Sequence, residues 1–255
     1  VPAAGLDGRP ADFTAEEPSS ARGRSVDSRR AKRILDLNSH TRDTIDETGC
    51  ADEPLAGGFW PLAAYMNHSC IPNVSRTFIG DVMIVRAARP LLVGVELVDS
   101  YTTLCQPLFS RKEHLMSTYG FDCSCARCSL EGVLLPEAQA KAIFEDKVGA
   151  LLGAPSRTSR QQLQTCAESW DALVSDIQGL VVSNIKRLGS RLDDDKKQRL
   201  VNMVCASFGQ ASMNAASAWK ELMSPAACTK SCEQVCQQLE EVSANSVQHA
   251  LWSAE

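Results

Sequence analysis

The feature that most constrains the fold of this chain is a group of three closely spaced cysteines in the segment YGFDCSCARC, from Tyr119 to Cys128. Cys123, Cys125 and Cys128 have the spacing C-x-C-x-x-C, which lets three thiolates converge on one ion from a tight turn. Structural zinc takes four tetrahedral ligands and suits thiolates, so the trio leaves one ligand to be supplied from elsewhere. Cys70 is the candidate for that fourth position. The alternative is that the three cysteines are small buried side chains without a metal.

The chain of 255 residues contains 11 cysteines, and they cluster rather than spread. An odd, clustered set argues against a secreted disulfide framework and favours reduced thiols or a metal site. This predicts an intracellular protein, in the cytoplasm, the nucleus or both. The net charge of -5 argues against nucleic-acid binding over the whole surface. No apolar run approaches the roughly 20 residues of a membrane helix, so we expect no membrane contact.

The first half of the chain reads as a tail followed by short strands and turns. Residues 1–30 are rich in Ala, Gly, Pro, Ser and charge, which predicts a disordered or loosely packed tail. The chain starts without methionine or a leader pattern, so we expect a fragment or a processed chain. A short helix is expected over residues 31–42, and the apolar run FWPLAAYM, residues 59–66, predicts a short buried helix. Further on, a Gly-Asp turn at residues 80–81 between apolar runs predicts a hairpin, and GVELVDSY predicts another short strand.

From Pro136 onward, the apolar residues recur at a helical period. Residues 159–192 predict one long helix or a pair of helices, with Gly179 and Gly189 as the places where a break would fall. Asp193 begins the next helix, because the acidic residues of its first turn favour the helix dipole, and Pro225 starts another. The sequence therefore predicts an all-helical region over residues 133–255.

A second trio of cysteines lies in this helical region. Cys228, Cys232 and Cys236 are spaced four residues apart and fall on one helical face. No fourth ligand is at hand, so we expect these thiols to pack as small apolar groups in a helix interface.

The segment YMNHSCIPNVS places Asn67, His68 and Cys70 within four residues. Taken by itself, the Asn-His pair can serve simply to cap a turn. The order of the motifs adds to this: LNSH and GGFWPLAAYMNHSC come first, then GVELVDSY, then YGFDCSCARC. Together, over residues 31 to about 130, they resemble the C-terminal half of a SET domain with its post-SET zinc segment, in the subclass that bears MYND and tetratricopeptide (TPR) modules.

The resemblance implies an α+β fold in four parts. A partial SET domain of the β-clip type spans residues 31–121, and a post-SET zinc segment spans residues 122–132. The tail at residues 1–30 precedes them, and an all-helical, TPR-like region follows at residues 133–255. The motif order of the subclass implies a pseudoknot in which the NHSC segment lies against DSY.

Proteins of this family transfer a methyl group from S-adenosylmethionine to a protein lysine, and the resemblance implies the same reaction here, on a histone or another protein, by a monomer. Tyr101 matches the tyrosine whose hydroxyl sits by the transferred methyl group; the alternative is a plain core tyrosine. The residues that match cofactor contacts are Asn38, Asn67, His68, Tyr101 and Phe121. The residues that match zinc ligands are Cys70, Cys123, Cys125 and Cys128.

Some positions depart from the family pattern. No Gly-x-Gly turn, which holds the methionine end of the cofactor, is found before Asn38, and there is no MYND zinc module. Val95, Val98 and Asp99 stand where the family has an acidic, a polar and an apolar residue. These departures keep a second hypothesis open: a non-catalytic, zinc-stabilised SET remnant that acts as a scaffold while the helical region binds a protein partner. Binding of S-adenosylmethionine would distinguish the two.

Overall fold

The computed structural model describes part of the chain, in two units that comprise Val1–Asp36 and Leu37–Glu255. The described residues are 27–41, 57–153, 159–187 and 192–244. The tail predicted for residues 1–30 therefore lies almost wholly outside them, as does Gly189. In the described part, helix α1 (Ser28–Asn38) begins earlier than expected, because the Asp27 carboxylate accepts hydrogen bonds from the first backbone N–H groups of the helix.

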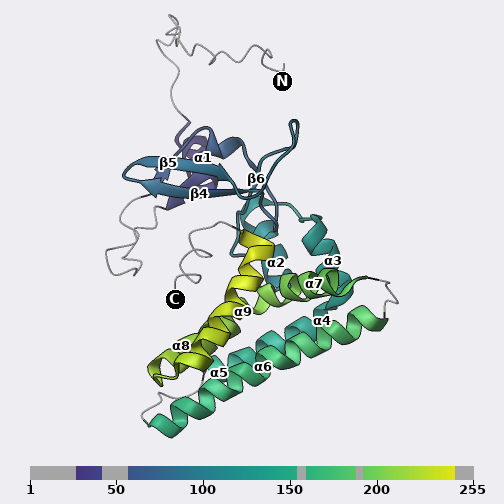
Figure 1. The fold of residues 1–255 in the computed structure, drawn as a ribbon. Helices are drawn as coiled ribbons and strands as arrows, with labels where there is room; N and C mark the ends of the chain where they lie inside the picture. The colour runs from purple at the N-terminus through teal and green to yellow at the C-terminus, as the bar shows by residue number, and fades with distance from the viewer. Residues whose placement is uncertain (1–26, 42–56, 154–158, 188–191, 245–255) are drawn as a thin grey trace, which may run out of the picture. The chain divides into compact units, whose positions relative to one another are not determined.

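The strands within the described residues form three separate two-stranded sheets, and the β4–β5 pair is the one that stands out in Figure 1. Their pairings are β1 (Ser39–Thr41) with β2 (Gly57–Phe59), β3 (Asn67–His68) with β6 (Val98–Asp99), and β4 (Val74–Ile79) with β5 (Val82–Ala87). The β4–β5 pair confirms the predicted hairpin. Gly80, at its turn, has a φ of +58°, a left-handed conformation that glycine adopts without a Cβ clash.

The segment FWPLAAYM is not a buried helix, and that prediction is wrong. Phe59 ends strand β2, and only the 3-10 turn η1 (Ala63–Tyr65) is helical. Leu62 and Tyr65 are 80% and 84% exposed. Pro61 accounts for the difference, because it disfavours the helical conformation of the residue before it and cannot donate a backbone hydrogen bond.

The NHSC and DSY segments lie side by side, as the resemblance implies. Strand β3 pairs in parallel with β6, with Asn67 opposite Val98 and His68 opposite Asp99. The Ser69 N–H then donates to the Asp99 carbonyl at 2.9 Å, which extends the pairing beyond the short strand. Only two residues of GVELVDSY are in strand conformation.

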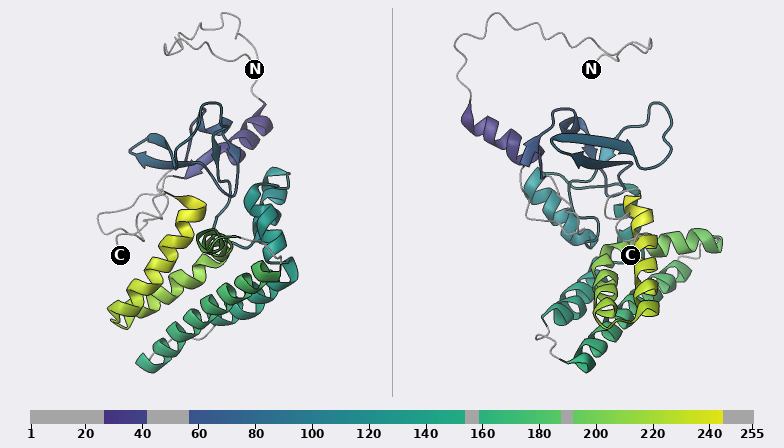
Figure 2. Two further views of the ribbon diagram at one scale, coloured as in Figure 1. Left: turned by 45° about the vertical axis from the view of Figure 1, so that its right-hand side comes forward. Right: turned by 60° about the vertical axis from the view of Figure 1, so that its left-hand side comes forward.

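Beyond Pro136 the described chain is mainly helical, as predicted, and two further helices lie within residues 108–134. The helices are α2 (Leu108–Tyr119), α3 (Ala126–Leu134), α4 (Glu137–Lys141), the π-helical turn η2 (Ala142–Val148), α5 (Gly149–Leu152), α6 (Arg160–Arg187), α7 (Asp194–Cys205), the 3-10 turn η3 (Ala206–Phe208), α8 (Gly209–Glu221) and α9 (Pro225–Ser243). Helix α8 packs against both α6 and α9 (Figures 1 and 2). None of the described helices is both long and apolar enough to cross a membrane.

Local sequence explains where several of these helices begin and end. Asp193 caps α7 by accepting a hydrogen bond from the Lys196 N–H at 2.8 Å, and Pro225 occupies the first turn of α9, both as predicted. Gly179 does not break α6. Its neighbours Ile177 and Val181 are buried in the main helical core, and this packing outweighs the roughly 1 kcal/mol that a glycine costs in a helix.

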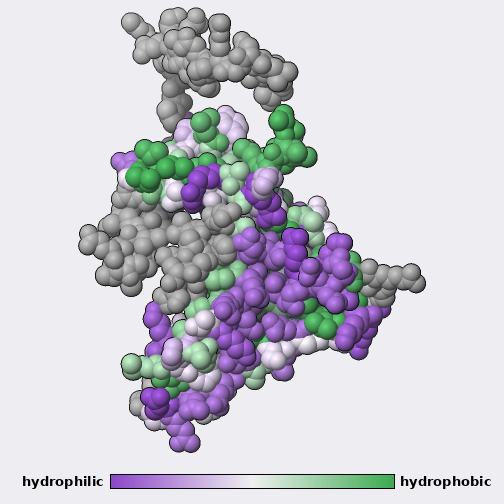
Figure 3. All heavy atoms as spheres, viewed as in Figure 1, coloured by the Kyte–Doolittle hydropathy of each residue, from purple (hydrophilic) through white to green (hydrophobic). Residues whose placement is uncertain are grey.

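The two parts of the second unit differ in their surfaces. Figure 3 shows hydrophobic residues over the strand-containing part, whereas the helical part faces the viewer mainly with hydrophilic residues. The strongly exposed apolar side chains of the strand-containing part include Leu62, Tyr65, Ile79, Val82, Leu92 and Val93.

Candidate metal centre and adjoining cavity

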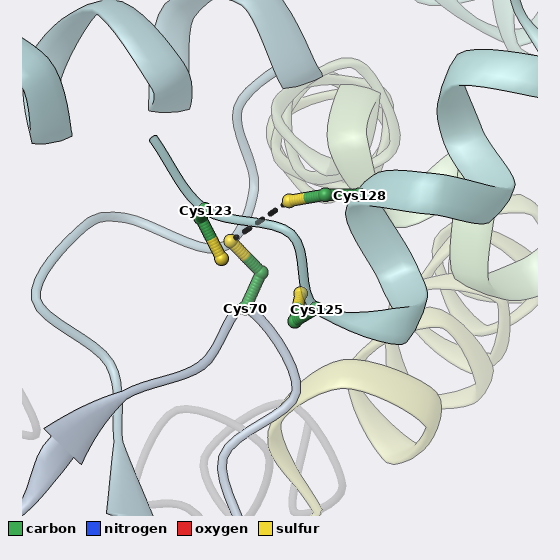
Figure 4. Close-up of side chains that lie close together, drawn as sticks. All are labelled: Cys70, Cys123, Cys125 and Cys128. Atoms are coloured by element: carbon green, nitrogen blue, oxygen red, sulfur yellow. Dashed lines mark hydrogen bonds between the residues drawn. The ribbon is translucent and has the colours of Figure 1, made fainter. Parts of the chain in front are cut away.

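Four cysteines from two distant segments meet at one point (Figure 4). Cys70 lies in the loop after β3, and the other three come from the turn between α2 and α3. Gly120, in a left-handed conformation, ends α2 and lets the chain turn, and Cys125 then stands at the N-terminus of α3. The four Sγ atoms lie within 4.8 Å of one another, and Cys70, Cys123 and Cys128 are buried.

This geometry fits a tetrahedral thiolate site. Zinc–sulfur bonds of about 2.3 Å place the sulfurs of such a site about 3.8 Å apart. The Sγ atoms of Cys128 and Cys70 are 3.6 Å apart. No other group of His, Cys, Asp or Glu side chains in the described part of the chain has a comparable arrangement, and no disulfide is formed there.

The ionisation of the thiols also favours a cation. Hydrogen bonds from Cys128 and Cys70 lower the pKa of Cys125, whereas the same contacts raise the pKa of Cys128 and raise that of Cys70 to about 12. Ionisation of one crowded thiol thus opposes the ionisation of its neighbours, because thiolates repel one another. A divalent cation removes this conflict, so the donor set suits a soft metal such as zinc.

His68 connects this centre with Tyr101. Its Nδ1 accepts a hydrogen bond from the Tyr101 N–H at 2.9 Å, and its Nε2 lies 3.3 Å from the Cys70 Sγ. Burial lowers the pKa of His68, so the ring is neutral at physiological pH. Because Nδ1 is an acceptor, the proton sits on Nε2 and points to the sulfur.

Tyr101 stands among aromatic side chains. Its ring centroid lies 4.9 Å from that of Tyr119, 5.3 Å from that of His68 and 6.4 Å from that of Phe121. The Tyr101 hydroxyl donates to the Met66 carbonyl. Burial, and then the charge of Asp99, raise the pKa of Tyr101, so the hydroxyl stays protonated at neutral pH.

A cavity of about 720 Å³ opens beside this tyrosine. Asn38, Tyr101 and Tyr119 line it, together with residues of the segment from Ser100 to Gln106. Ser243 and Ala244, at the end of α9, close another part of its wall. The volume falls within the roughly 300–1,000 Å³ of small-molecule sites in proteins.

The structure brings most of the predicted site residues together. Asn38 and Tyr101 line the cavity, and His68 and Phe121 contact the Tyr101 ring, from positions that are not in the described lining. Asn67 is apart from them: its side chain is exposed and donates to Glu96 Oε1 at 2.6 Å.

Two residues that shape the site were not predicted as site residues from the sequence. Asn73, the last residue of NHSCIPN, holds the two segments together: its Oδ1 accepts from the Val98 N–H at 2.9 Å and its Nδ2 donates to the Glu96 carbonyl at 2.8 Å. The repeated asparagine of the motif was the available signal. Asp99 is the other contributor.

Asp99 is buried in the cavity wall, where it forms an ion pair with Arg76 at 2.7 Å. Arg76 Nη1 also lies 2.6 Å from His40 Nδ1. Burial, and then the Arg76 charge, lower the pKa of His40, so its neutral nitrogen accepts this bond. The signal in the sequence was the acidic Asp99 at a position where the family has an apolar residue. A carboxylate that is buried there needs a cationic partner, and Arg76 is that partner.

Comparison with known proteins finds similarity to the SET domain family. Residues 13–102 match the SET domain family, so the match begins within the segment whose composition predicts a tail. The SET and MYND domain-containing protein DDB_G0273589 of Dictyostelium discoideum is 35% identical over 104 residues, which are 38% of this chain and 27% of that protein.

Two lysine methyltransferases are similar as well. N-lysine methyltransferase SMYD2-A of Xenopus laevis is 41% identical over 75 residues, 29% of this chain and 17% of the relative. Protein-lysine N-methyltransferase SMYD4 of Homo sapiens is 32% identical over 162 residues, 57% of this chain and 20% of the relative. The chain thus spans less than a third of the length of these relatives. It carries SET-domain sequence and is similar to the lysine methyltransferases of the SET and MYND domain-containing group, as its motifs indicate.

Proposed function

We propose that this chain is part of an S-adenosylmethionine-dependent protein lysine N-methyltransferase, and that Tyr101 stands at its reaction centre. The observation that carries the proposal is the position of Tyr101, which lines the cavity, packs on Phe121 and is joined by His68 to the four-cysteine centre. The similarity to N-lysine methyltransferases supports the same reaction class.

The cavity fits the cofactor in size and in lining. Its lining includes the polar residues Asn38, Thr102 and Thr103, and the rings of Tyr101 and Tyr119 offer an apolar surface. We assign the cofactor contacts to Asn38, Tyr101, His68 and Phe121. Asn67 joins them only if its side chain leaves Glu96, its partner in this structure. When bound, S-adenosylmethionine supplies a methyl group on a sulfonium, which is already activated for transfer to an amine.

The chain's own task is to present a neutral lysine amine in line with that methyl group. A lysine has a pKa near 10.4, so holding it neutral at pH 7.4 costs about 4 kcal/mol. Aromatic walls disfavour the charged form. Because the Tyr101 proton is committed to the Met66 carbonyl, the phenolic oxygen is left as an acceptor that can orient the amine. Alignment of this kind can supply about 7–11 kcal/mol.

We further propose that zinc occupies the four-cysteine centre and has a structural role, because all four ligand positions are taken by protein thiols. The proposal also includes the division of the chain into a SET segment, a zinc segment and a helical region that is similar to TPRs. It further includes a monomeric state and an intracellular location.

The test is transfer of a labelled methyl group from S-adenosylmethionine to lysine residues of acceptor proteins by the full-length protein. We expect transfer to protein lysine that the product analogue S-adenosylhomocysteine suppresses. A folded, zinc-loaded protein that binds the cofactor but labels no histone or cellular protein would remove the enzyme assignment and leave the scaffold reading.

A further inference from the structure

A buried cluster of charged side chains lies behind the metal centre and is not used by the proposed reaction. Arg111 from α2, Arg127 and Glu131 from α3, and Ser207 from η3 form it, and the two guanidinium groups have no exposed surface. Glu131 receives Arg111 Nη2 and Arg127 Nε, each at 2.6 Å, and the Ser207 hydroxyl at 2.7 Å. Ser207 in turn accepts from Arg111 Nη1 at 3.0 Å and from Arg127 Nη2 at 2.9 Å.

The cluster also donates hydrogen bonds to the backbone around the metal centre. Arg127 Nη1 donates to the Cys70 carbonyl at 3.2 Å, and Arg127 Nη2 donates to the Leu104 carbonyl at 2.8 Å. Arg111 donates to the carbonyl of Gln106. Leu104 and Gln106 both line the cavity. The cluster thus holds one metal-ligand loop and one wall of the cavity.

The charges of the cluster do not balance. Two guanidinium groups face one carboxylate, which leaves one excess positive charge in a buried site, and an unbalanced buried charge is costly. Arg111 Nε is buried and has no hydrogen-bond partner among the described residues. Arg127 Nη1 is bonded to the Cys70 carbonyl, which brings the charge of the cluster to the metal-ligand loop. Four thiolates around a divalent cation carry two negative charges, so a loaded metal centre supplies the missing counter-charge.

We propose that Arg111, Arg127, Glu131 and Ser207 form the outer shell of the four-cysteine metal centre, and that they couple metal binding to the docking of the helical region. Ser207 is the member that the helical region contributes, so metal affinity depends on a side chain 79 residues beyond the last cysteine ligand, Cys128. This inference rests on the metal part of the proposed function and not on methyl transfer.

The first test compares two serines that are equally buried. Ser207→Ala removes the hydroxyl that joins both arginines to Glu131. Ser212→Ala makes the same change in α8, where the serine accepts one hydrogen bond from Gln238. We expect Ser207→Ala to weaken zinc binding tenfold to a hundredfold, the range typical of outer-shell partners, in competition with a chromophoric chelator. Ser212→Ala should stay within about twofold of the parent. Equal affinities for all three proteins would overturn the coupling.

The second test needs no variant and decides the question if Ser207→Ala does not fold. Hydrogen exchange of the full chain is measured with zinc bound and after chelation. We expect chelation to speed exchange in α3 and in residues 201–208, at the end of α7 and in η3, and to leave residues 163–174 of α6 unchanged. Faster exchange confined to residues 119–128, or none in 201–208, would contradict the proposal. A parent that binds no zinc would also end it, although cofactor binding and methyl transfer could still be found.

Discussion

At the scale of single residues, His68 links the metal centre to Tyr101, which lines the cavity. One neutral imidazole accepts from the Tyr101 backbone and donates toward the Cys70 sulfur. Both ring nitrogens are therefore engaged by the protein. We therefore expect His68 to position Tyr101, and any contact of His68 with a cofactor to come from its ring face or its backbone.

The thiol cluster yields the first prediction at this scale. Cys125→Ser removes one of four ligands, and a hydroxyl is a much poorer ligand for zinc than a thiolate. Protein purified without added zinc should contain close to one equivalent of zinc per chain, and Cys125→Ser should contain almost none. Cys236→Ser, a cysteine of α9 outside the cluster, should keep the full equivalent. The zinc content of the three proteins is measured by plasma emission spectroscopy. A well-folded parent without zinc would contradict the proposed metal site.

Tyr101→Phe separates orientation from cofactor binding. The change keeps the ring that packs on His68 and Phe121 and removes the hydroxyl that would orient the amine. In the full-length protein, we expect cofactor affinity to stay within about threefold while the rate of methyl transfer falls on the order of a hundredfold. Tyr65→Phe, at an exposed tyrosine, is the control and should keep the parent rate. An unchanged rate for Tyr101→Phe would show that the hydroxyl has no part in the reaction.

At the scale of elements, two glycines test how the backbone sets the fold. An added Cβ meets no atom within 4 Å at Gly80 or at Gly179, so contacts do not distinguish them. Gly80 has a φ of +58°, where a Cβ is disfavoured, so Gly80→Ala should destabilise the protein by about 1–2 kcal/mol. Gly179 lies within helix α6, so Gly179→Ala should stabilise it by about 0.5–1 kcal/mol. Chemical denaturation measures the free energy of unfolding of both variants. A change of the same sign in both would contradict the different backbone roles of Gly80 and Gly179.

The same elements show what the sequence could predict. Local signals were sufficient for the hairpin turn at Gly80, for the start of α7 at Asp193 and for the start of α9 at Pro225, because turn and cap chemistry is encoded within a few residues. The run FWPLAAYM was misread, because its apolar composition favours a buried helix, whereas Pro61 within the run disfavours the helical conformation of the residue before it. The placement of Cys70 beside the trio came from the order of the motifs.

The buried charges were beyond local prediction. Arg111 and Arg127 lie in the segments FSRKEH and CARCSLEG, and neither segment carries a local pattern that marks its arginine as buried. Both guanidinium groups donate to Ser207, which lies 96 residues beyond Arg111 and approaches them only in the folded protein. A sequence pattern that covers one helix at a time holds no information about such a contact.

At the scale of the whole molecule, the metal centre, the cavity and the helical region form one connected arrangement within Leu37–Glu255. The cysteine loop is bonded through Arg127 to Ser207 in η3, and the end of α9 closes part of the cavity that Tyr101 lines. The helical region is therefore part of the site and not an appendage to it. This arrangement explains how a segment of few strands can hold a defined cavity.

The most direct test of the central claim is calorimetric titration of the zinc-loaded chain with S-adenosylmethionine. We expect one site per chain with a dissociation constant on the order of micromolar, corresponding to about -8 kcal/mol. Asn38→Ala should weaken it roughly tenfold, because a cofactor group left unpaired in the cavity costs about 1–3 kcal/mol. Asn214→Ala, in α8 and outside the cavity lining, should bind as the parent does. A folded, zinc-loaded chain that gives no saturable heat with the cofactor at millimolar concentration would contradict the account.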